Sequence, residues 1–364
     1  MIGVGFADRK QVMTDTESKA EFYAAANSKR GFFSLFDEIF DERKLEKLYI
    51  IKGGSGIGKS RLMREIAEAA EHSGFAVEYY YCSSDPKSLD GIIIKEKKLA
   101  VIDGTAPHTR DPHFPGAVDE IINLGEFWDT AALESARERI IELCDLKKAA
   151  FERSYSLLSL AGKVGEISDK LIESAFDFAK LEAFATRFVG KLPRDGGAAR
   201  ERAVFVSAIS YLGHKALPTF GSAGKIIKTD GKYGASEVVM AALRRAAKKR
   251  GVSCTAALDP LDPAKCEALY FDGADTAVIK AENCTCGENF RALRFIDGDA
   301  MRKLRPELRR LEKMHTETLE SAIACLKEAF GYHAELESIY SGTMDFEAKE
   351  AFTAELIKKL IPES

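Results

Sequence analysis

Apolar runs and amphipathic stretches alternate along the chain, and this alternation predicts an α/β fold. Residues 48–51 form an apolar run of strand length, and residues 75–82 and 99–102 have the same character. Residues 61–72 instead carry their apolar side chains at helical spacing, and they end at Ser73-Gly74, a typical helix stop. We therefore predict a strand, a helix and two further strands in this order.

Shorter elements precede this region, and long helices follow it. Before the first strand the sequence predicts three elements in succession: a strand at 21–26, a turn at 27–31 and a helix at 32–40. Regions rich in Ala, Leu, Glu and Lys predict helices, at least two of them in residues 130–192 and others in residues 300–330 and 344–360.

A glycine-rich loop joins the first strand to the first long helix. Residues 53–60 read Gly-Gly-Ser-Gly-Ile-Gly-Lys-Ser and match the phosphate-binding pattern G-x-x-x-x-G-K-[ST]. Glycines let backbone N–H groups surround phosphate oxygens, and the helix adds the positive end of its dipole. Lys59 is expected to reach the β- and γ-phosphates, and the Ser60 hydroxyl is expected to bind Mg²⁺. The predicted nucleotide-binding residues are Gly53, Gly54, Ser55, Gly56, Ile57, Gly58, Lys59 and Ser60.

A carboxylate at the end of a later strand is the second candidate ligand for magnesium. Asp103 follows three apolar residues, as the Walker B aspartate does, and it is expected to hold Mg²⁺ opposite Ser60. A turn-capping role for Asp103 is the alternative. Gly104 comes next, where many ATPases have a glutamate that activates water, so we expect hydrolysis to be slow.

The segment after this strand, residues 105–116, carries further chemistry. Because ligands of open α/β sheets bind at the carboxyl ends of the strands, we expect His108 and Arg110 to face the γ-phosphate or an acceptor. A solvated surface loop is the alternative. Asp85 and Asp90 are candidates for a general base, but a structural role is favoured for Asp85 because it recurs in the second half of the chain.

That recurrence belongs to an internal repeat with an offset of 177 residues. Ten positions, beginning with Gly54 and ending with Ile102, are identical to their partners from Gly231 to Ile279. The tails repeat at an offset of 168, where Asp177-Phe178 matches Asp345-Phe346. Ordered matches of this kind predict two copies of one α/β unit.

The second copy lacks the residues that the chemistry needs. At the same offset, the counterparts of Gly58, Lys59, Ser60 and Asp103 are Ala235, Ser236, Glu237 and Lys280. A glutamate in place of the hydroxyl and the loss of the lysine should repel a triphosphate. Partial replacement by Lys232 and Lys280 is the alternative. We predict a non-catalytic second copy.

These observations define two predicted domains. Residues 1–197 form an active P-loop NTPase domain with a helical appendage at about 126–192, and residues 198–364 form a degenerate P-loop-like domain with C-terminal helices. Each is expected to be a three-layer α/β unit, and residues 193–200 are the predicted joint.

Composition narrows the cellular setting. The 53 basic and 57 acidic side chains nearly balance, which argues against nucleic acid and anionic membranes as partners. The seven scattered cysteines do not indicate a disulfide framework, and no apolar run has membrane-spanning length. The first ten residues are charged too early for a secretory signal, so a cytoplasmic location is predicted.

Several stretches of the first copy resemble a bacterial family of tandem P-loop proteins, loosely labelled ATPase or nucleotide kinase. The resemblance rests on residues 52–60, 82–85, 89–91, 103–108 and 115–125, with Trp128. It implies two P-loop domains in tandem. Members of that family can carry a full phosphate loop in the second copy as well, and this chain does not.

Together these features predict Mg²⁺-dependent binding and slow hydrolysis of ATP in the first copy. ATP is favoured over GTP because the chain contains no N-K-x-D or T-K-x-D motif. Phosphoryl transfer to a small acceptor, possibly a nucleotide, is the first alternative, although no arginine-rich lid is evident. A nucleotide-gated interaction protein with an unknown protein partner is the second.

Overall fold

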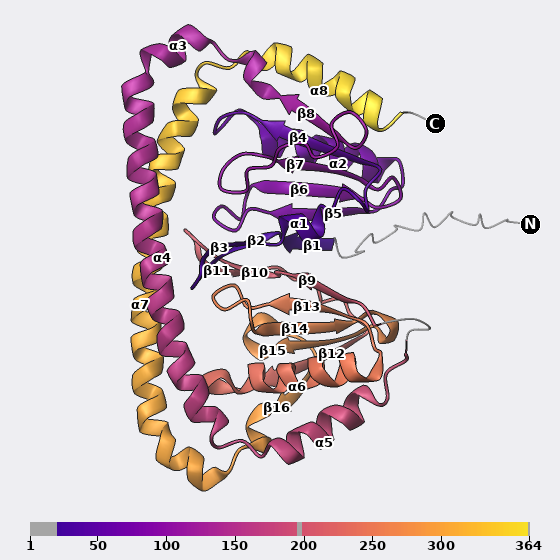
Figure 1. Cartoon of the computed structure of the whole chain (residues 1–364), viewed down its shortest axis with the longest axis vertical. Helices are drawn as coiled ribbons and strands as arrows, with labels where there is room; N and C mark the ends of the chain where they lie inside the picture. Colours follow the sequence, from indigo (N-terminus) through magenta and orange to yellow (C-terminus); the bar gives the residue numbers. More distant parts are fainter. Residues whose placement is uncertain (1–19, 195–198, 363–364) are drawn as a thin grey trace, which may run out of the picture.

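A computed structural model describes residues 20–194 and 199–362 and contains two similar α/β units in tandem (Figure 1). The six-stranded sheet of the first unit has the order β1-β5-β6-β7-β4-β8, and that of the second has the order β9-β13-β14-β15-β12-β16. The predicted α/β class and internal duplication are therefore confirmed. The predicted joint at 193–200 lies partly outside the described residues.

The two units follow each other with matching elements. The first unit contains β1 (Ala20–Tyr23), β2 (Ala25–Ser28), β3 (Gly31–Ser34), α1 (Phe36–Ile39), β4 (Lys47–Lys52), α2 (Lys59–His72), β5 (Val77–Tyr81), β6 (Leu89–Ile94), β7 (Leu99–Asp103) and β8 (Asp119–Asn123). The second contains β9 (Glu201–Val204), β10 (Ser207–Ser210), β11 (Gly213–Ala216), β12 (Lys225–Asp230), α6 (Ala235–Arg250), β13 (Cys254–Leu258), β14 (Cys266–Phe271), β15 (Thr276–Lys280) and β16 (Glu288–Arg291).

Helices follow each unit, as predicted for residues 130–192, 300–330 and 344–360. After the first unit come α3 (Thr130–Ser135), α4 (Arg137–Glu173) and α5 (Phe178–Val189). After the second come α7 (Gly298–Ser341) and α8 (Phe346–Leu360).

Several short elements differ from the sequence-based predictions. The strand predicted at 21–26 is divided between β1 and β2, and the first part of the helix predicted at 32–40 is strand β3. The reason is a hairpin: β2 pairs with β3, and Gly31 closes the turn with a φ of 87°, which side chains disfavour. Strands β6 and β8 were not predicted, and β6 runs antiparallel to both of its neighbours.

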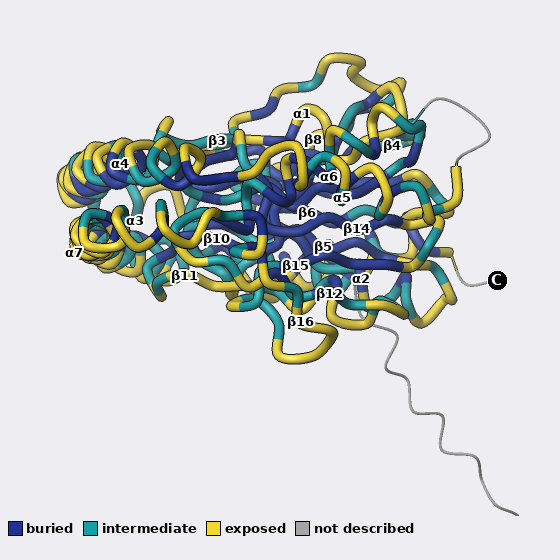
Figure 2. Tube along the Cα trace, turned by 90° about the horizontal axis from the view of Figure 1, so that it is seen from below, coloured by how far each residue is buried: buried dark blue, intermediate teal, exposed yellow. Residues whose placement is uncertain are grey.

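Each sheet buries both faces. Helix α2 covers one face of the first sheet, and Phe36 of α1 and Phe40, which follows α1, pack on the other. The two sheets meet at their edges, where the Tyr23 backbone N–H donates to the Phe205 carbonyl at 2.9 Å. Figure 2 shows buried strands at the centre and the long helices α4 and α7 along one side, with their outer faces exposed.

The helical tails are exchanged between the units (Figure 1). Leu356 and Leu360 of α8 belong to the hydrophobic core beneath α2, although α8 follows the second unit in the sequence. Leu181 and Val189 of α5 belong to the core beneath α6. Matching backbone bonds fix the crossing, because Asp345 N donates to Phe127 O and Asp177 N donates to Phe295 O, both at 2.7 Å.

Helices α4 and α7 make this exchange possible, because they pack antiparallel along one side of the molecule and extend from one unit to the other (Figure 1). At the centre of the pair the Ser154 hydroxyl donates to the Ala322 carbonyl at 3.0 Å. Nearer the first unit, Arg139 binds both carboxylate oxygens of Glu335, each at 2.8 Å. Each sheet unit is therefore completed by a helix that follows the other unit.

Because of this exchange, a substitution in the helix that follows one unit should destabilise the other unit. Leu360→Ala should lower the free energy of unfolding by about 2–5 kcal/mol, as buried Leu→Ala changes do, and should raise amide exchange in α2. Leu181→Ala should instead raise amide exchange in α6. Hydrogen exchange with mass spectrometry measures both, and an increase confined to the sheet unit that precedes each helix would contradict the exchange.

Candidate functional site

The glycine loop has the predicted context between β4 and α2. Gly58 precedes the first residue of α2 and has a φ of 85°, and Gly56 has a φ of 70°. L-residues seldom adopt such angles, so glycine is required here. The loop therefore presents its backbone at the positive N-terminal end of a 14-residue helix.

The predicted catalytic lysine and carboxylate lie together beside this loop. Lys59 Nζ is 3.1 Å from Asp103 Oδ2, and it donates to Thr105 Oγ1 at 2.9 Å and to Gly53 O at 3.2 Å. Asp103 Oδ1 accepts from the backbone N–H of Thr105 at 2.9 Å and from its hydroxyl at 2.6 Å. These bonds hold the Lys59 and Asp103 side chains at the carboxyl end of β7.

Ser60 faces the same cavity as Lys59 and Asp103. Its hydroxyl oxygen accepts from Leu89 N at 2.9 Å. Hydroxyl and carboxylate oxygens are the donors that Mg²⁺ prefers, so Ser60 and Asp103 fit a magnesium ion whose other ligands would be phosphate and water. Within residues 20–194 and 199–362, no three His, Cys, Asp or Glu side chains are grouped to hold a metal ion by themselves.

The cavity has a volume of about 970 Å³ and is enclosed by the long helices as well as by the loop. Helix α4 contributes Lys147, Phe151 and Tyr155, and α7 contributes Phe330, His333 and Glu337. These residues could not be predicted from the sequence, because a helical pattern does not indicate which distant loop a helix will cover.

Contacts between α7 and the glycine loop are close. A Cβ atom at Gly56 would lie 2.7 Å from the Glu337 carbonyl oxygen, and one at Gly54 would lie 2.7 Å from the Tyr340 ring. Ser55 Oγ lies 3.4 Å from His333 Nδ1. The glycines thus serve packing against α7 as well as any phosphate.

His108 also lines this cavity and is buried. Its Nε2 lies 3.4 Å from Asp90 Oδ1, and its ring stacks on Phe36 at a centroid distance of 4.4 Å. Burial lowers the pKa of His108, but the Asp90 carboxylate outweighs it, so the pKa is raised overall. Nδ1 is buried and has no hydrogen-bond partner among the described residues.

Asp85 closes a turn, as its recurrence predicted, and it also lines the cavity. Its two carboxylate oxygens accept from the Lys87 backbone N–H at 3.2 Å and from the Ser88 hydroxyl at 2.6 Å, and these bonds close the turn before β6. The carboxylate that contacts His108 is that of Asp90.

Arg110 lies away from the cavity, contrary to our expectation that it would face the γ-phosphate. Its guanidinium donates to Asp37 Oδ1 at 2.8 Å, to Phe40 O at 3.2 Å and to the buried carboxylate of Glu42. Burial raises the pKa of Glu42, but Arg110 outweighs this effect and the pKa is lowered overall. The local sequence did not reveal this pairing because Glu42 lies 68 residues earlier.

Arg110→Met should therefore reduce stability rather than turnover alone. The variant leaves Glu42 with His113 as its remaining partner, at 3.0 Å, and should cost about 3 kcal/mol at neutral pH. The loss should shrink as the pH falls towards about 4, because a protonated Glu42 needs no cation. Urea unfolding at several pH values measures this effect, and an unchanged midpoint at pH 7 would contradict the assignment.

The corresponding loop of the second unit is shorter. Residues 53–58 join β4 to α2, whereas residues 231–234 join β12 to α6. Gly234 has the left-handed conformation before α6 that Gly58 has before α2, so Gly234 rather than Ala235 is the counterpart of Gly58, whereas the buried residues of the two helices, such as Met63 and Met240, keep the offset of 177. Two residues of the phosphate loop are missing in the second unit.

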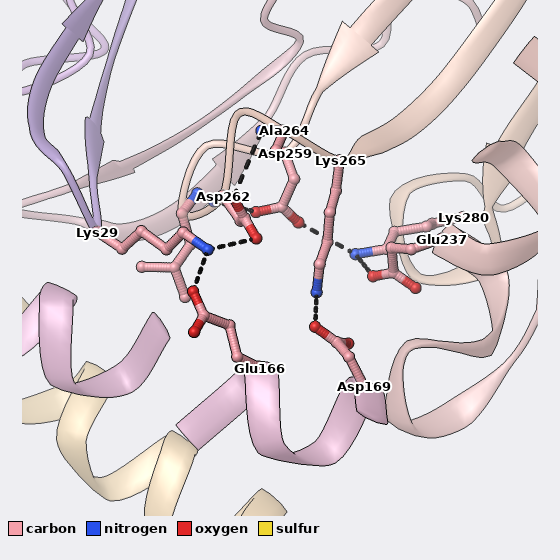
Figure 3. A network of polar contacts seen from close by, with 10 residues as sticks. Lys29, Glu166, Asp169, Glu237, Asp259, Asp262, Ala264, Lys265 and Lys280 are labelled. Carbon is pink, nitrogen blue, oxygen red and sulfur yellow. Dashed lines mark hydrogen bonds and ion pairs between the residues drawn. The ribbon is translucent and has the colours of Figure 1, made fainter. Parts of the chain in front are cut away.

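Ion pairs fill the space beside this shortened loop (Figure 3). Lys280 Nζ lies 2.5 Å from Glu237 Oε1 and 3.4 Å from Asp259 Oδ2, so the positions of Asp103 and Ser60 are occupied by a lysine and a glutamate that pair with each other. Lys265 pairs with Asp169 of α4. Lys29, from the hairpin of the first unit, lies 2.7 Å from both Glu166 and Asp262. Lys280 is thus engaged by carboxylates in this arrangement.

Lys280→Met should lower the free energy of unfolding, because it leaves buried carboxylates without a cation. Burial lowers the pKa of Lys280, yet Glu237 and Asp259 outweigh it, so the pKa is raised and the stabilisation is present at neutral pH. The variant should lose about 3–5 kcal/mol near pH 7 and less near pH 5, where the abandoned carboxylates can take up protons. Adding Glu237→Gln should recover part of the loss. Equal stability of wild type and variant at pH 7 would overturn this account.

No helix in the described part of the chain is long and apolar enough to cross a membrane. The chain matches no protein-family model, no curated protein and no solved structure, and its resemblance to the tandem P-loop family stays a prediction.

Proposed function

We propose that the first unit binds Mg²⁺-ATP at residues 53–60 and hydrolyses it slowly. The observation that carries this proposal is the meeting of Lys59, Ser60 and Asp103 around a glycine loop at the start of α2. A loop backbone, an ammonium, a hydroxyl and a carboxylate in this arrangement are what a magnesium–triphosphate complex needs.

Each residue has a distinct proposed role. The loop N–H groups would bind phosphate oxygens, and Lys59 would exchange its contacts with Asp103 and Thr105 for the β- and γ-phosphates. Ser60 and Asp103 would hold Mg²⁺, which neutralises phosphate charge when bound. Gly104 leaves no carboxylate next to Asp103 to activate water, which favours slow hydrolysis.

Transfer of the γ-phosphate to a small acceptor is the second candidate function. The cavity of about 970 Å³ continues past the loop to Phe151, Tyr155 and Phe330, which leaves room beside a triphosphate. His108 lines this cavity and contacts Asp90, and in this function it would accept a proton from an acceptor hydroxyl.

The fate of the γ-phosphate separates these functions. Labelled ATP and Mg²⁺ are incubated with the protein, with and without a filtered extract of small metabolites. Release of phosphate without extract is expected, and Lys59→Ala should reduce it by about a hundredfold or more. His108→Asn should leave hydrolysis near wild type if its role is towards an acceptor.

Other results would change the assignment. Label that moves to a new compound only with extract, and less in His108→Asn, would establish the second candidate and identify the acceptor. Binding without turnover would favour a nucleotide-gated interaction protein. Absence of any nucleotide binding by the wild type would refute the proposal.

A further inference from the structure

Lys147 of α4 is a cation without a counter-ion in the phosphate-loop cavity. It lines the same cavity as Lys59, and among the described residues no carboxylate oxygen lies within 4.0 Å of its ammonium and no hydrogen-bond acceptor contacts it. Burial is the main cause that lowers the pKa of Lys147, and the charge of Lys59 adds to it, whereas Cys144 and Glu337 act in the opposite direction without outweighing it. A half-buried charge of this kind is costly unless an anion joins it.

The second unit provides an internal comparison. Its lysines Lys265 and Lys280 face carboxylates, as Figure 3 shows, and so does Lys29 where it reaches across from the first unit. These three buried or half-buried cations near the eroded loop are thus paired within the protein, whereas Lys232 of the loop itself is exposed. Lys147, near the complete loop, is left available to a ligand.

The duplication of the helices allows Lys147 to be compared with the equivalent residue of α7. The offset of 168 residues pairs Lys147 with His315 of α7, and it pairs Phe330 with Gly162. The surroundings correspond, because Tyr211 of the second hairpin stacks on Phe330 whereas Lys29 of the first hairpin lies against Gly162. Burial lowers the pKa of His315, so the position equivalent to Lys147 beside the eroded loop is neutral at pH 7.

His333 of α7 supports an anion site in the same place. Its Nδ1 lies 3.4 Å from Ser55 Oγ. Burial, and to a smaller extent the positive charge of Lys147, lower the pKa of His333 to about 4. In this structure a neutral imidazole and two ammonium groups therefore line the cavity beside the glycine loop, together with the Glu337 carboxylate, whose Oε1 lies 3.5 Å from His333 Nε2. Phosphate oxygens would complement the imidazole and the two ammonium groups.

We propose that Lys147 is a second phosphate-binding lysine, which α4 supplies to the terminal phosphate of a nucleoside triphosphate held by residues 53–60. The proposal rests on the proposed function of the first unit. Lys147 would stabilise the negative charge of the terminal phosphate, as an arginine finger does in other NTPases. The triphosphate site would then be complete only when α4 is in place.

Titration calorimetry with Mg²⁺-ATPγS and Mg²⁺-ADP tests this role. Lys147→Met should weaken ATPγS binding about ten- to a hundredfold, the usual effect of losing a charged hydrogen bond. It should weaken ADP binding much less, because ADP lacks the terminal phosphate. Lys147→Arg should bind both nucleotides nearly as the wild type does. Lys163→Met, which removes an exposed lysine of the same helix, is the matched control.

The outcomes distinguish the inference from the proposed function. If wild type binds ATPγS, Lys59→Ala does not and Lys147→Met binds normally, the inference is wrong and the proposed function stands. Equal losses for ATPγS and ADP would also overturn it, because they would place Lys147 at an inner phosphate. If wild type binds neither nucleotide, the proposed function itself fails. Lys147→Gln gives the same comparison if Lys147→Met loses helical circular dichroism.

Discussion

The antiparallel pairing of α4 with α7 is the interaction on which the other features depend. These helices carry α5 to the second unit and α8 to the first, so each sheet acquires core residues from the other half of the chain. The same helices form one wall of the phosphate-loop cavity through residues such as Lys147 and His333. Loss of this pairing would open a hydrophobic core and the candidate site together.

The charged side chains beside the loop differ between the two similar units. In the first, Lys59 and Asp103 meet beside a complete loop, and Lys147 has no protein counter-ion among the described residues. In the second, the loop is two residues shorter and Lys280 is bound by Glu237 and Asp259. We infer that the first unit keeps a site for an anion, while the charges of the second unit hold its own elements and α4 together.

Local patterns in the sequence predicted the parts of the site that lie close in the chain. The glycine spacing, the apolar run before it and the helical period after it all arise within residues 48–72, so they identify strand, loop and helix. The partners of Arg110, the exchange of α5 and α8 and the place of Lys147 depend on contacts between distant residues. The three consecutive isoleucines of β6 could have indicated a strand, but its antiparallel pairing with β5 and β7 could not be predicted from the local pattern.

The central claim is that this duplicated chain has one working nucleotide site. Native mass spectrometry with Mg²⁺ and a slowly hydrolysed ATP analogue tests it by counting bound nucleotides. We predict one nucleotide per chain, and none when Lys59 is replaced by alanine. Two nucleotides per chain, or one that remains bound to Lys59→Ala, would contradict the claim.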